Sequence, residues 1–452
     1  MLPELSCRAG LFALALATFD GAAIGGCRER ASSPAGSAVA TAASAARAPR
    51  DSATVLALAS TTGGGPADRA IVRAESVAAR NSSKADAWTL LGQAWIGKAR
   101  ESSDPGYYLN ASACADLALR ASPDDGTALD LRAMVLLSQH RFEEARVLAA
   151  TNVAKTPDDA TAYGVLSDAL LELGRLPEAV SATQSMMDLK PNAASYSRTA
   201  RLRWLRGDVA GAERVLRDAI DATAPGPGSE PRAWVLVDAA MLFWHQGDYD
   251  GADAGFDLAL RALADYPPAL VGKARVRLAK DDGAGAAELL ARAYARSPLA
   301  ETAWLLGDAR SLLGDDAGAR EAYGRVEREG RRSDPRTLSL FESTTARDPA
   351  DALALAERER AVRDDAYTED VYAWALFRSG RLAEARRAID AAMRWRTPEA
   401  RFAYHAGAIR IAQGERASGR ALVERALALN PKFDPTGAQE ARRLLEEQHA
   451  HL

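Results

Sequence analysis

The feature that most constrains the fold of this chain is a recurrence of about 34 residues. Proline occurs at positions 123, 157, 191 and 225, each 34 residues after the one before. Small residues spaced by 12 and then 7 positions recur with it, at Ala200/Ala212/Ala219, Ala240/Ala252/Ala259, Ala274/Ala286/Ala293 and Ala373/Ala385/Ala392. Repeats of this length are typical of stacked supersecondary units, each of which buries its apolar face against its neighbours.

The residue types in the repeat predict pairs of α-helices. Hydrophobic residues make up 48% of the 452 residues but aromatic residues only 6%, which favours closely packed helices over β-sandwiches. Small residues are expected where two helices press together, because larger side chains would hold their axes apart. A glycine that ends the first helix of a unit is expected at Gly174, Gly207, Gly247, Gly314, Gly380 and Gly414.

This pattern resembles the tetratricopeptide repeat, a unit of 34 residues that forms a helix, a turn and a second helix, over residues 67–433. The resemblance implies an all-α chain folded as an α-solenoid, a right-handed superhelix of stacked helical hairpins. About ten units are expected, with first helices that begin near residues 85, 126, 160, 193, 233, 267, 300, 335, 366 and 400. In this family the first helices line the concave face, which implies that the groove binds partners.

The flanking segments differ from the repeats in composition. Residues 1–27 resemble a bacterial lipoprotein signal, with an apolar stretch at Ala9–Phe19 and a lipobox that ends at Cys27 as the expected lipidation site. Residues 28–66 are rich in Ala, Ser, Gly and Pro and predict a disordered linker. The Pro- and Gly-rich segment 225–231 predicts a hinge in the array, and residues 434–452 predict a C-terminal capping helix and tail.

Charge and motifs exclude several classes of function. Fifty-seven basic and 61 acidic residues give a net charge of −4, which argues against nucleic-acid binding. Only three cysteines are present, and the five histidines are scattered along the sequence, so no metal site is expected. The sequence contains no nucleophile elbow, zinc-protease motif or phosphate-binding loop. We therefore expect a protein that is not an enzyme and that needs no cofactor.

Function is then expected on the groove surface, where aromatic and basic residues gather at positions that face inward. Aromatic and arginine side chains are the usual anchors of binding interfaces, and guanidinium groups can engage the carboxylates of a peptide. The alternative interpretation is that these tryptophans fill the space between diverging helices. The candidate groove residues are Arg198, Arg201, Trp204, Trp234, Met241, Trp244, Arg275, Trp304, Trp374, Phe377 and Tyr404.

The leading hypothesis is an exported, non-enzymatic scaffold that binds a protein or peptide partner at a bacterial cell envelope. A lipid on Cys27 would attach it to the membrane, and the protein would otherwise be periplasmic. The signal would have no lipid if the lipobox is a chance match. If the start codon is wrongly assigned, the chain is instead a cytoplasmic adaptor or assembly chaperone. A regulatory subunit of an enzyme is a further alternative.

Overall fold

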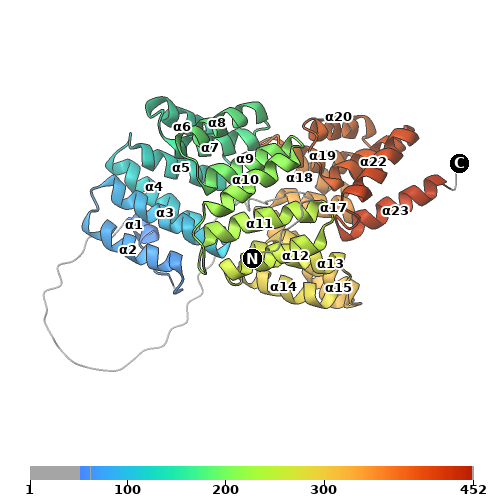
Figure 1. Cartoon of the computed structure of the whole chain (residues 1–452), viewed down its shortest axis with the longest axis horizontal. Helices are drawn as coiled ribbons and strands as arrows, with labels where there is room; N and C mark the ends of the chain where they lie inside the picture. The colour runs from blue at the N-terminus through green and yellow to red at the C-terminus, as the bar shows by residue number, and fades with distance from the viewer. Residues whose placement is uncertain (1–50, 62, 450–452) are drawn as a thin grey trace, which may run out of the picture.

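The computed structural model describes residues 51–61 and 63–449, and every regular element within them is a helix (Figure 1). Most of these helices form ten pairs, each with a first or A helix and a second or B helix. The A helices are α3 (Ala85–Ser102), α5 (Gly126–Ser138), α7 (Ala160–Glu172), α9 (Ala193–Leu205), α11 (Glu230–His245), α13 (Pro267–Ala279), α15 (Ala300–Leu312), α17 (Pro335–Thr345), α19 (Ala366–Arg378) and α21 (Ala400–Ala412). The B helices are α4 (Tyr108–Ala121), α6 (Phe142–Lys155), α8 (Leu176–Leu189), α10 (Val209–Asp221), α12 (Tyr249–Ala262), α14 (Gly283–Arg296), α16 (Asp316–Ser333), α18 (Pro349–Arg360), α20 (Leu382–Met393) and α22 (Arg416–Leu429).

The helix pairs confirm the all-α solenoid. Nine of the ten A helices begin at the residue expected from the repeat, and α11 begins at Glu230 instead of near 233. The small residues of the 12-then-7 pattern lie where helices touch, and all twelve named above are completely buried. Each glycine expected to end an A helix has a positive φ, so the chain takes the left-handed conformation there.

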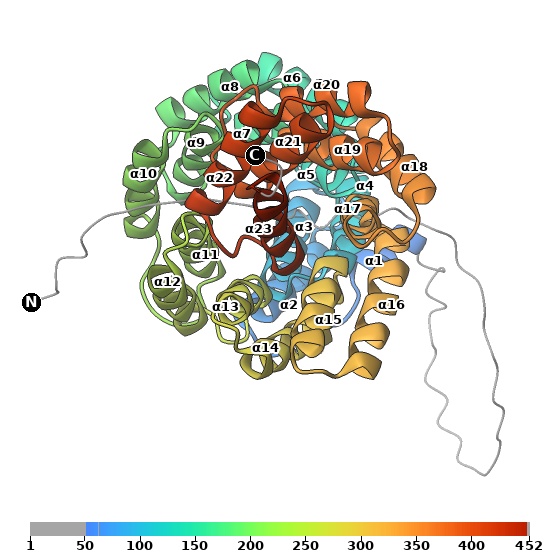
Figure 2. The ribbon, with the colours of Figure 1, turned by 90° about the vertical axis from the view of Figure 1, so that its right-hand side faces the viewer.

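The array winds into a superhelix in which the A helices face inward and the B helices outward (Figure 2). Most hydrogen bonds between its two successive turns join residues 181 to 194 positions apart in sequence. One superhelical turn therefore takes between five and six helix pairs. The second turn lies directly against the first, so the groove is not an open concave face.

The contacts between turns follow a repeated scheme. The last four carbonyl groups of a helix have no partner within it and must be satisfied from elsewhere. At the ends of α7, α9 and α11, donors from the segments after α18, α20 and α22 supply such a partner. The pairs are Asp364 N to Glu172 O at 2.9 Å, Thr397 Oγ1 to Leu205 O at 2.9 Å and Asn430 Nδ2 to Trp244 O at 2.8 Å.

Helices outside the pairs close the two ends of the array. At the N-terminal end, α2 (Pro66–Arg80) packs against α3. The short 3₁₀ helix η1 (Pro105–Tyr107) lies between α3 and α4. At the other end α23 (Pro435–His449) forms the expected C-terminal helix, and it crosses the middle of the ring in Figure 2.

The expectation that residues 28–66 form a disordered linker is wrong for its last part. Residues Ser52–Ala57 form helix α1, which packs against α4. Trp95 donates a hydrogen bond of 3.0 Å from its indole nitrogen to the Ala57 carbonyl, and Ala57 is completely buried. The short apolar run in an otherwise small and polar segment is enough to dock on a preformed surface, although it could not fold alone.

Other expectations about the flanking segments stay predictions. The signal segment, the lipobox with Cys27 and most of the linker lie outside the described residues. In the segment 225–231, Gly228 and Ser229 both donate to Ala262 O, at 2.7 and 3.2 Å, and hinge motion there is untested. Among the helices of the described ranges, none is long and apolar enough to cross a membrane.

One residue of the N-terminal core gives a simple test of the packing. Cys114 on α4 is completely buried, and this burial raises the pKa of its thiol well above the usual range. In a chain with Cys7→Ser and Cys27→Ser, we expect native Cys114 to react with iodoacetamide at least about 100-fold more slowly than in denaturant, because reaction requires local opening. Equal reaction rates in the native and denatured states would contradict the burial of Cys114 between α4 and its neighbours.

Candidate binding cavity

The inner faces of the A helices enclose a cavity of about 150 Å³ between the two superhelical turns. Side chains from α7 and every later A helix line it, and residues 433–437 at the start of α23 close one side. A second cavity of about 260 Å³ adjoins it and shares Trp244, Arg275, Asp308, Phe433 and Asp434 with the first. Charged and aromatic side chains line the cavity together. Cavities between helices, in which polar groups converge, are common binding sites of proteins.

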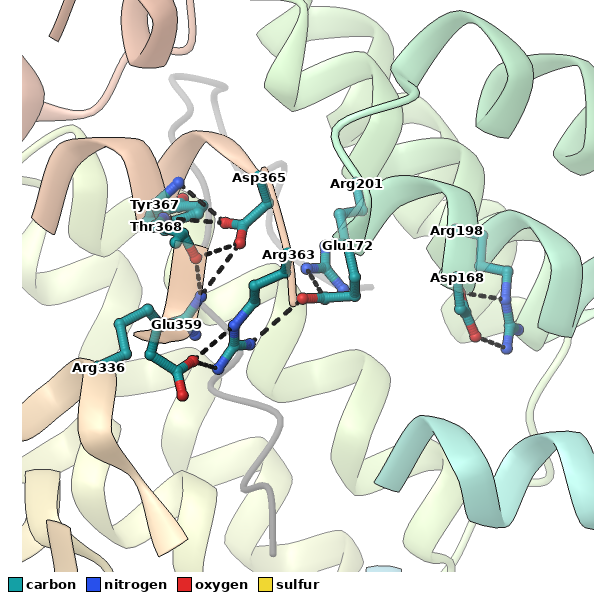
Figure 3. Close-up of polar contacts among 10 residues, drawn as sticks. All are labelled: Asp168, Glu172, Arg198, Arg201, Arg336, Glu359, Arg363, Asp365, Tyr367 and Thr368. Carbon is teal, nitrogen blue, oxygen red and sulfur yellow. Dashed lines mark hydrogen bonds and ion pairs between the residues drawn. The ribbon is translucent and has the colours of Figure 1, made fainter. Parts of the chain in front are cut away.

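The structure brings eight of the eleven predicted groove residues together around this cavity. These are Arg201, Trp204, Met241, Trp244, Arg275, Trp304, Trp374 and Tyr404. The other three lie elsewhere. Arg198 forms a bidentate ion pair with Asp168 (Figure 3), Trp234 packs beneath the guanidinium of Arg100, and Phe377 stacks on Trp374.

Most of the aromatic residues are more deeply buried than an open groove would leave them. Trp204, Trp244, Trp374 and Tyr404 are at least 96% buried, whereas Trp304 is half-buried. The sequence placed these rings on a face exposed to a partner, and this is wrong for the four buried rings. The second turn of the superhelix covers the face, so the rings belong both to the core and to the cavity wall.

The arginines of the cavity are all paired with carboxylates of the protein itself. Arg275 Nη2 lies 2.5 Å from Glu301 Oε1, and Arg401 Nε lies 2.9 Å from Asp370 Oδ2. Arg201 and Arg336 pair with Glu172 and Asp365 at 3.6 and 3.4 Å. These guanidinium groups therefore hold the wall together and are not free to bind the carboxylates of a ligand.

An ionic cluster at the contact between the turns adjoins the cavity, and its members Glu172, Arg336 and Asp365 line the wall (Figure 3). Arg363, in the loop after α18, has a side chain that is 1% exposed. Its Nη2 lies 2.5 Å from Glu359 Oε2, and its Nη1 lies 3.3 Å from Glu172 Oε2 at the end of α7. Beside it Thr368 donates a hydrogen bond of 2.5 Å to Asp365. The cluster joins the first turn to the second with buried charges on both sides.

Two further carboxyl groups line the cavity where α15 faces the start of α23. Burial raises the pKa of Asp308 to about 7, and the nearby Asp434 adds to the rise although Tyr323 donates a hydrogen bond of 2.9 Å to Asp308. Burial also raises the pKa of Asp434, which accepts a hydrogen bond from the Gly437 amide at the start of α23. These groups differ from the other cavity carboxylates because no basic side chain in the described residues forms an ion pair with either.

Two buried histidines also line the cavity, each next to a carboxylate. His405 Nδ1 lies 2.8 Å from Asp370, and His245 Nδ1 lies 3.2 Å from Glu399. His405 also stacks on Trp374 with ring centroids 4.0 Å apart. Within the part of the chain that the structure describes, no group of three or more His, Cys, Asp or Glu is placed to hold a metal ion.

Sequence reasoning missed the polar half of this cavity. It treated His245 and His405 as scattered residues, and it did not select Asp308 or Asp434. The spacing within one helix could have found His405, because Arg401 and His405 lie four residues apart and so share one face of α21 with a common partner in Asp370. No local pattern could have placed residues 433–437 against α15, because this contact depends on the closure of the superhelix.

Comparison with known proteins finds solved structures that are similar to the chain at low sequence identity. No family model and no curated protein matches the chain. A crystal structure of PilW, described as a type IV pilus biogenesis factor, is 17% identical and covers 48% of this chain and 97% of its own, with a TM-score of 0.39. A tetratricopeptide repeat protein from Parabacteroides merdae is 16% identical over 53% of this chain and 93% of its own, with a TM-score of 0.38. A human IFIT1 dimer with PPP-AAAA is 13% identical over 81% of this chain and 87% of its own, with a TM-score of 0.47.

Proposed function

We propose that the chain is a non-enzymatic scaffold of helical repeats that binds a segment of a partner protein in its inner cavity. The observation that carries the proposal is that eight aromatic, arginine and methionine side chains from six A helices converge on one cavity. Side chains of these types dominate binding hot spots, and methionine adapts to varied ligands. The A helices hold these groups on a rigid frame, which lowers the entropic cost of binding.

We further propose that the protein is exported and attached to the bacterial envelope through a lipid on Cys27. The support for this part is the lipobox and the apolar segment before it. Growth of an expressing bacterium with a labelled fatty acid should label the full-length protein but not its Cys27→Ser variant. Label on neither protein, together with a cytoplasmic location of both, would favour the adaptor alternative.

The binding proposal can be tested with two tryptophans that differ in position and not in exposure. Trp304 and Trp234 are both half-buried predicted groove residues, but only Trp304 lines the cavity. We expect Trp304→Leu to reduce capture of the partner by at least about tenfold, as for a central aromatic anchor, and Trp234→Leu to leave it unchanged.

The experiment uses the full chain to capture binding proteins from the source cells, and it compares the amount of each captured protein among the native chain and the two variants. Far-ultraviolet circular dichroism and the melting temperature check that both variants are folded. Equal loss with both variants, or with neither, would show that the cavity is not the binding site.

A further inference from the structure

We propose that the cavity binds a Lys or Arg side chain of the partner segment, with Asp308 and Asp434 as its carboxylate partners and Trp244 and Trp304 as its aromatic walls. This inference rests on the proposed function and specifies the chemistry of what the cavity binds. It reverses the expectation from the sequence, in which the guanidinium groups of the groove bind a carboxylate of the ligand. In the present proposal the ligand supplies the cation.

Two carboxyl groups of the cavity wall have no basic partner among the described residues, whereas the arginines of the wall are all paired. Arg201, Arg275, Arg336 and Arg401 each form an ion pair with a carboxylate of the protein. Asp308 and Asp434 form no ion pair with any basic side chain of the described residues, although Arg401 acts on Asp434 from a distance. Both lie on the part of the wall that is common to the two adjoining cavities. The charge left uncompensated in the cavity is therefore negative, and a cation is the group that it would attract.

The aromatic residues favour the same kind of ligand. Trp244 lies on the shared wall with both carboxyl groups, and Trp304 lies on the same helix as Asp308, one turn before it. A cation held over the face of a tryptophan ring gains about 0.5–2 kcal/mol from the ring quadrupole, and more where water is excluded. A Lys or Arg side chain also has an aliphatic stem that can pack against such rings.

Two buried polar atoms in the cavity wall indicate that the site is incomplete without a ligand. His245 has a side chain that is 7% exposed, and its Nδ1 lies 3.2 Å from Glu399. Among the described residues its Nε2 has no hydrogen-bond partner, and neither does the indole nitrogen of Trp374, which is 1% exposed. An indole nitrogen can only donate, and the backbone carbonyls of a peptide offer acceptors for it.

Protonation of Asp308 gives the proposal a second measurable consequence. Its pKa of about 7 means that the carboxyl group is partly protonated near neutral pH. A bound cation favours the charged form, so binding should release a proton and should strengthen as the pH rises from 6 to 8. The charged and titratable groups that share these cavities with Asp308 are Glu172, Arg201, His245, Arg275, Asp281, Glu301, Tyr323, Arg336, Asp365, Tyr367, Glu399, Arg401, Tyr404, His405, Lys432, Asp434 and Arg442.

The experiment measures binding of four heptapeptides to the full chain by isothermal titration calorimetry. Each peptide consists of alanine except at its central residue, which is Arg, Lys, Gln or Glu. The N-terminus is acetylated and the C-terminus amidated. We expect the Arg and Lys peptides to bind at least about tenfold more tightly than the Gln and Glu peptides, as for a charge-assisted contact. Argininamide alone tests whether a free guanidinium compound is sufficient, and we expect it to bind more weakly than the Arg peptide.

The matched variants are Asp308→Asn in the cavity and Asp218→Asn on the outer face of α10, where Asp218 is exposed. The first should lower the affinity for the Arg peptide roughly tenfold and abolish its rise between pH 6 and 8, whereas the second should change neither. Asparagine keeps an oxygen that can accept from Tyr323, so Asp308→Asn should fold, and its melting temperature checks this.

The outcomes separate this inference from the proposed function. The inference is overturned if the Glu or Gln peptide binds as tightly as the Arg peptide, if Asp308→Asn leaves the Arg peptide unaffected, or if argininamide binds as well as the peptide. Capture of the partner would still depend on Trp304 in each of these cases if the proposed function is correct. If capture does not depend on Trp304, the proposed function itself fails.

Discussion

Replacement of Arg363 by alanine should lower the free energy of unfolding by about 3–5 kcal/mol, the loss expected when one partner of a buried ion pair is removed. The guanidinium of Arg363 is 1% exposed and lies between Glu359 and Glu172. Without it, Glu359 stays buried with its compensating charge removed, and Glu172 keeps only the longer pair with Arg201 at 3.6 Å. The second turn should then separate from the first, and we expect the cavity to open.

A matched arginine on the surface gives the control. Arg381 forms a similar bidentate pair with Glu384, at 2.7 and 2.6 Å, but its side chain is 40% exposed. Arg381→Ala should cost less than about 1 kcal/mol, because exposed ion pairs contribute little. Denaturant unfolding measures both losses, and small-angle X-ray scattering should show a larger radius of gyration for Arg363→Ala alone. Equal losses for the two variants would mean that the buried cluster does not hold the turns together.

The fold could be predicted because its determinants are local. The small residues at Ala200, Ala212 and Ala219 fix how closely two helices pack, and the glycine or proline that ends each helix lies within a few residues of it. These signals recur in almost every unit, so an error in the predicted bounds of one unit does not shift the bounds of the next. The departures arise where a tertiary contact stabilises a weak segment, as in α1, which depends on Trp95 and on α4.

The candidate site could be predicted only in part, for a physical reason. The face of an A helix is set by its own periodicity, so residues such as Trp304 and Arg275 were placed on the inner side correctly. Whether that side is open or closed depends on the superhelix, which is the sum of small rotations between units. The contact of Asp364 with Glu172 spans the whole of one superhelical turn, and no short-range pattern reports it.

Because the superhelix is closed, replacement by alanine should destabilise the protein far more at one glycine than at the equivalent glycines of other units. Gly174 and Gly380 both end an A helix, with φ of +68° and +75°. Alanine in this conformation costs about 1–2 kcal/mol at either position. At Gly174, however, the added Cβ would lie well inside van der Waals contact with the backbone carbonyl oxygen of Asp364 in the second turn, whereas at Gly380 no atom lies within 4 Å.

We therefore expect Gly174→Ala to lower the free energy of unfolding by about 1–3 kcal/mol more than Gly380→Ala does. This is the usual range for overpacking against atoms that cannot move aside. Gly207→Ala should fall between them, because its Cβ would lie 3.1 Å from the carbonyl oxygen of Arg396. Denaturant unfolding of the three variants measures this order. If all three lose the same free energy, the cost is that of the left-handed conformation alone, and the turns are not in close contact in solution. If the order holds, the additional loss at Gly174 comes from the contact that keeps the groove closed, because the three substitutions place the same methyl group in the same backbone conformation.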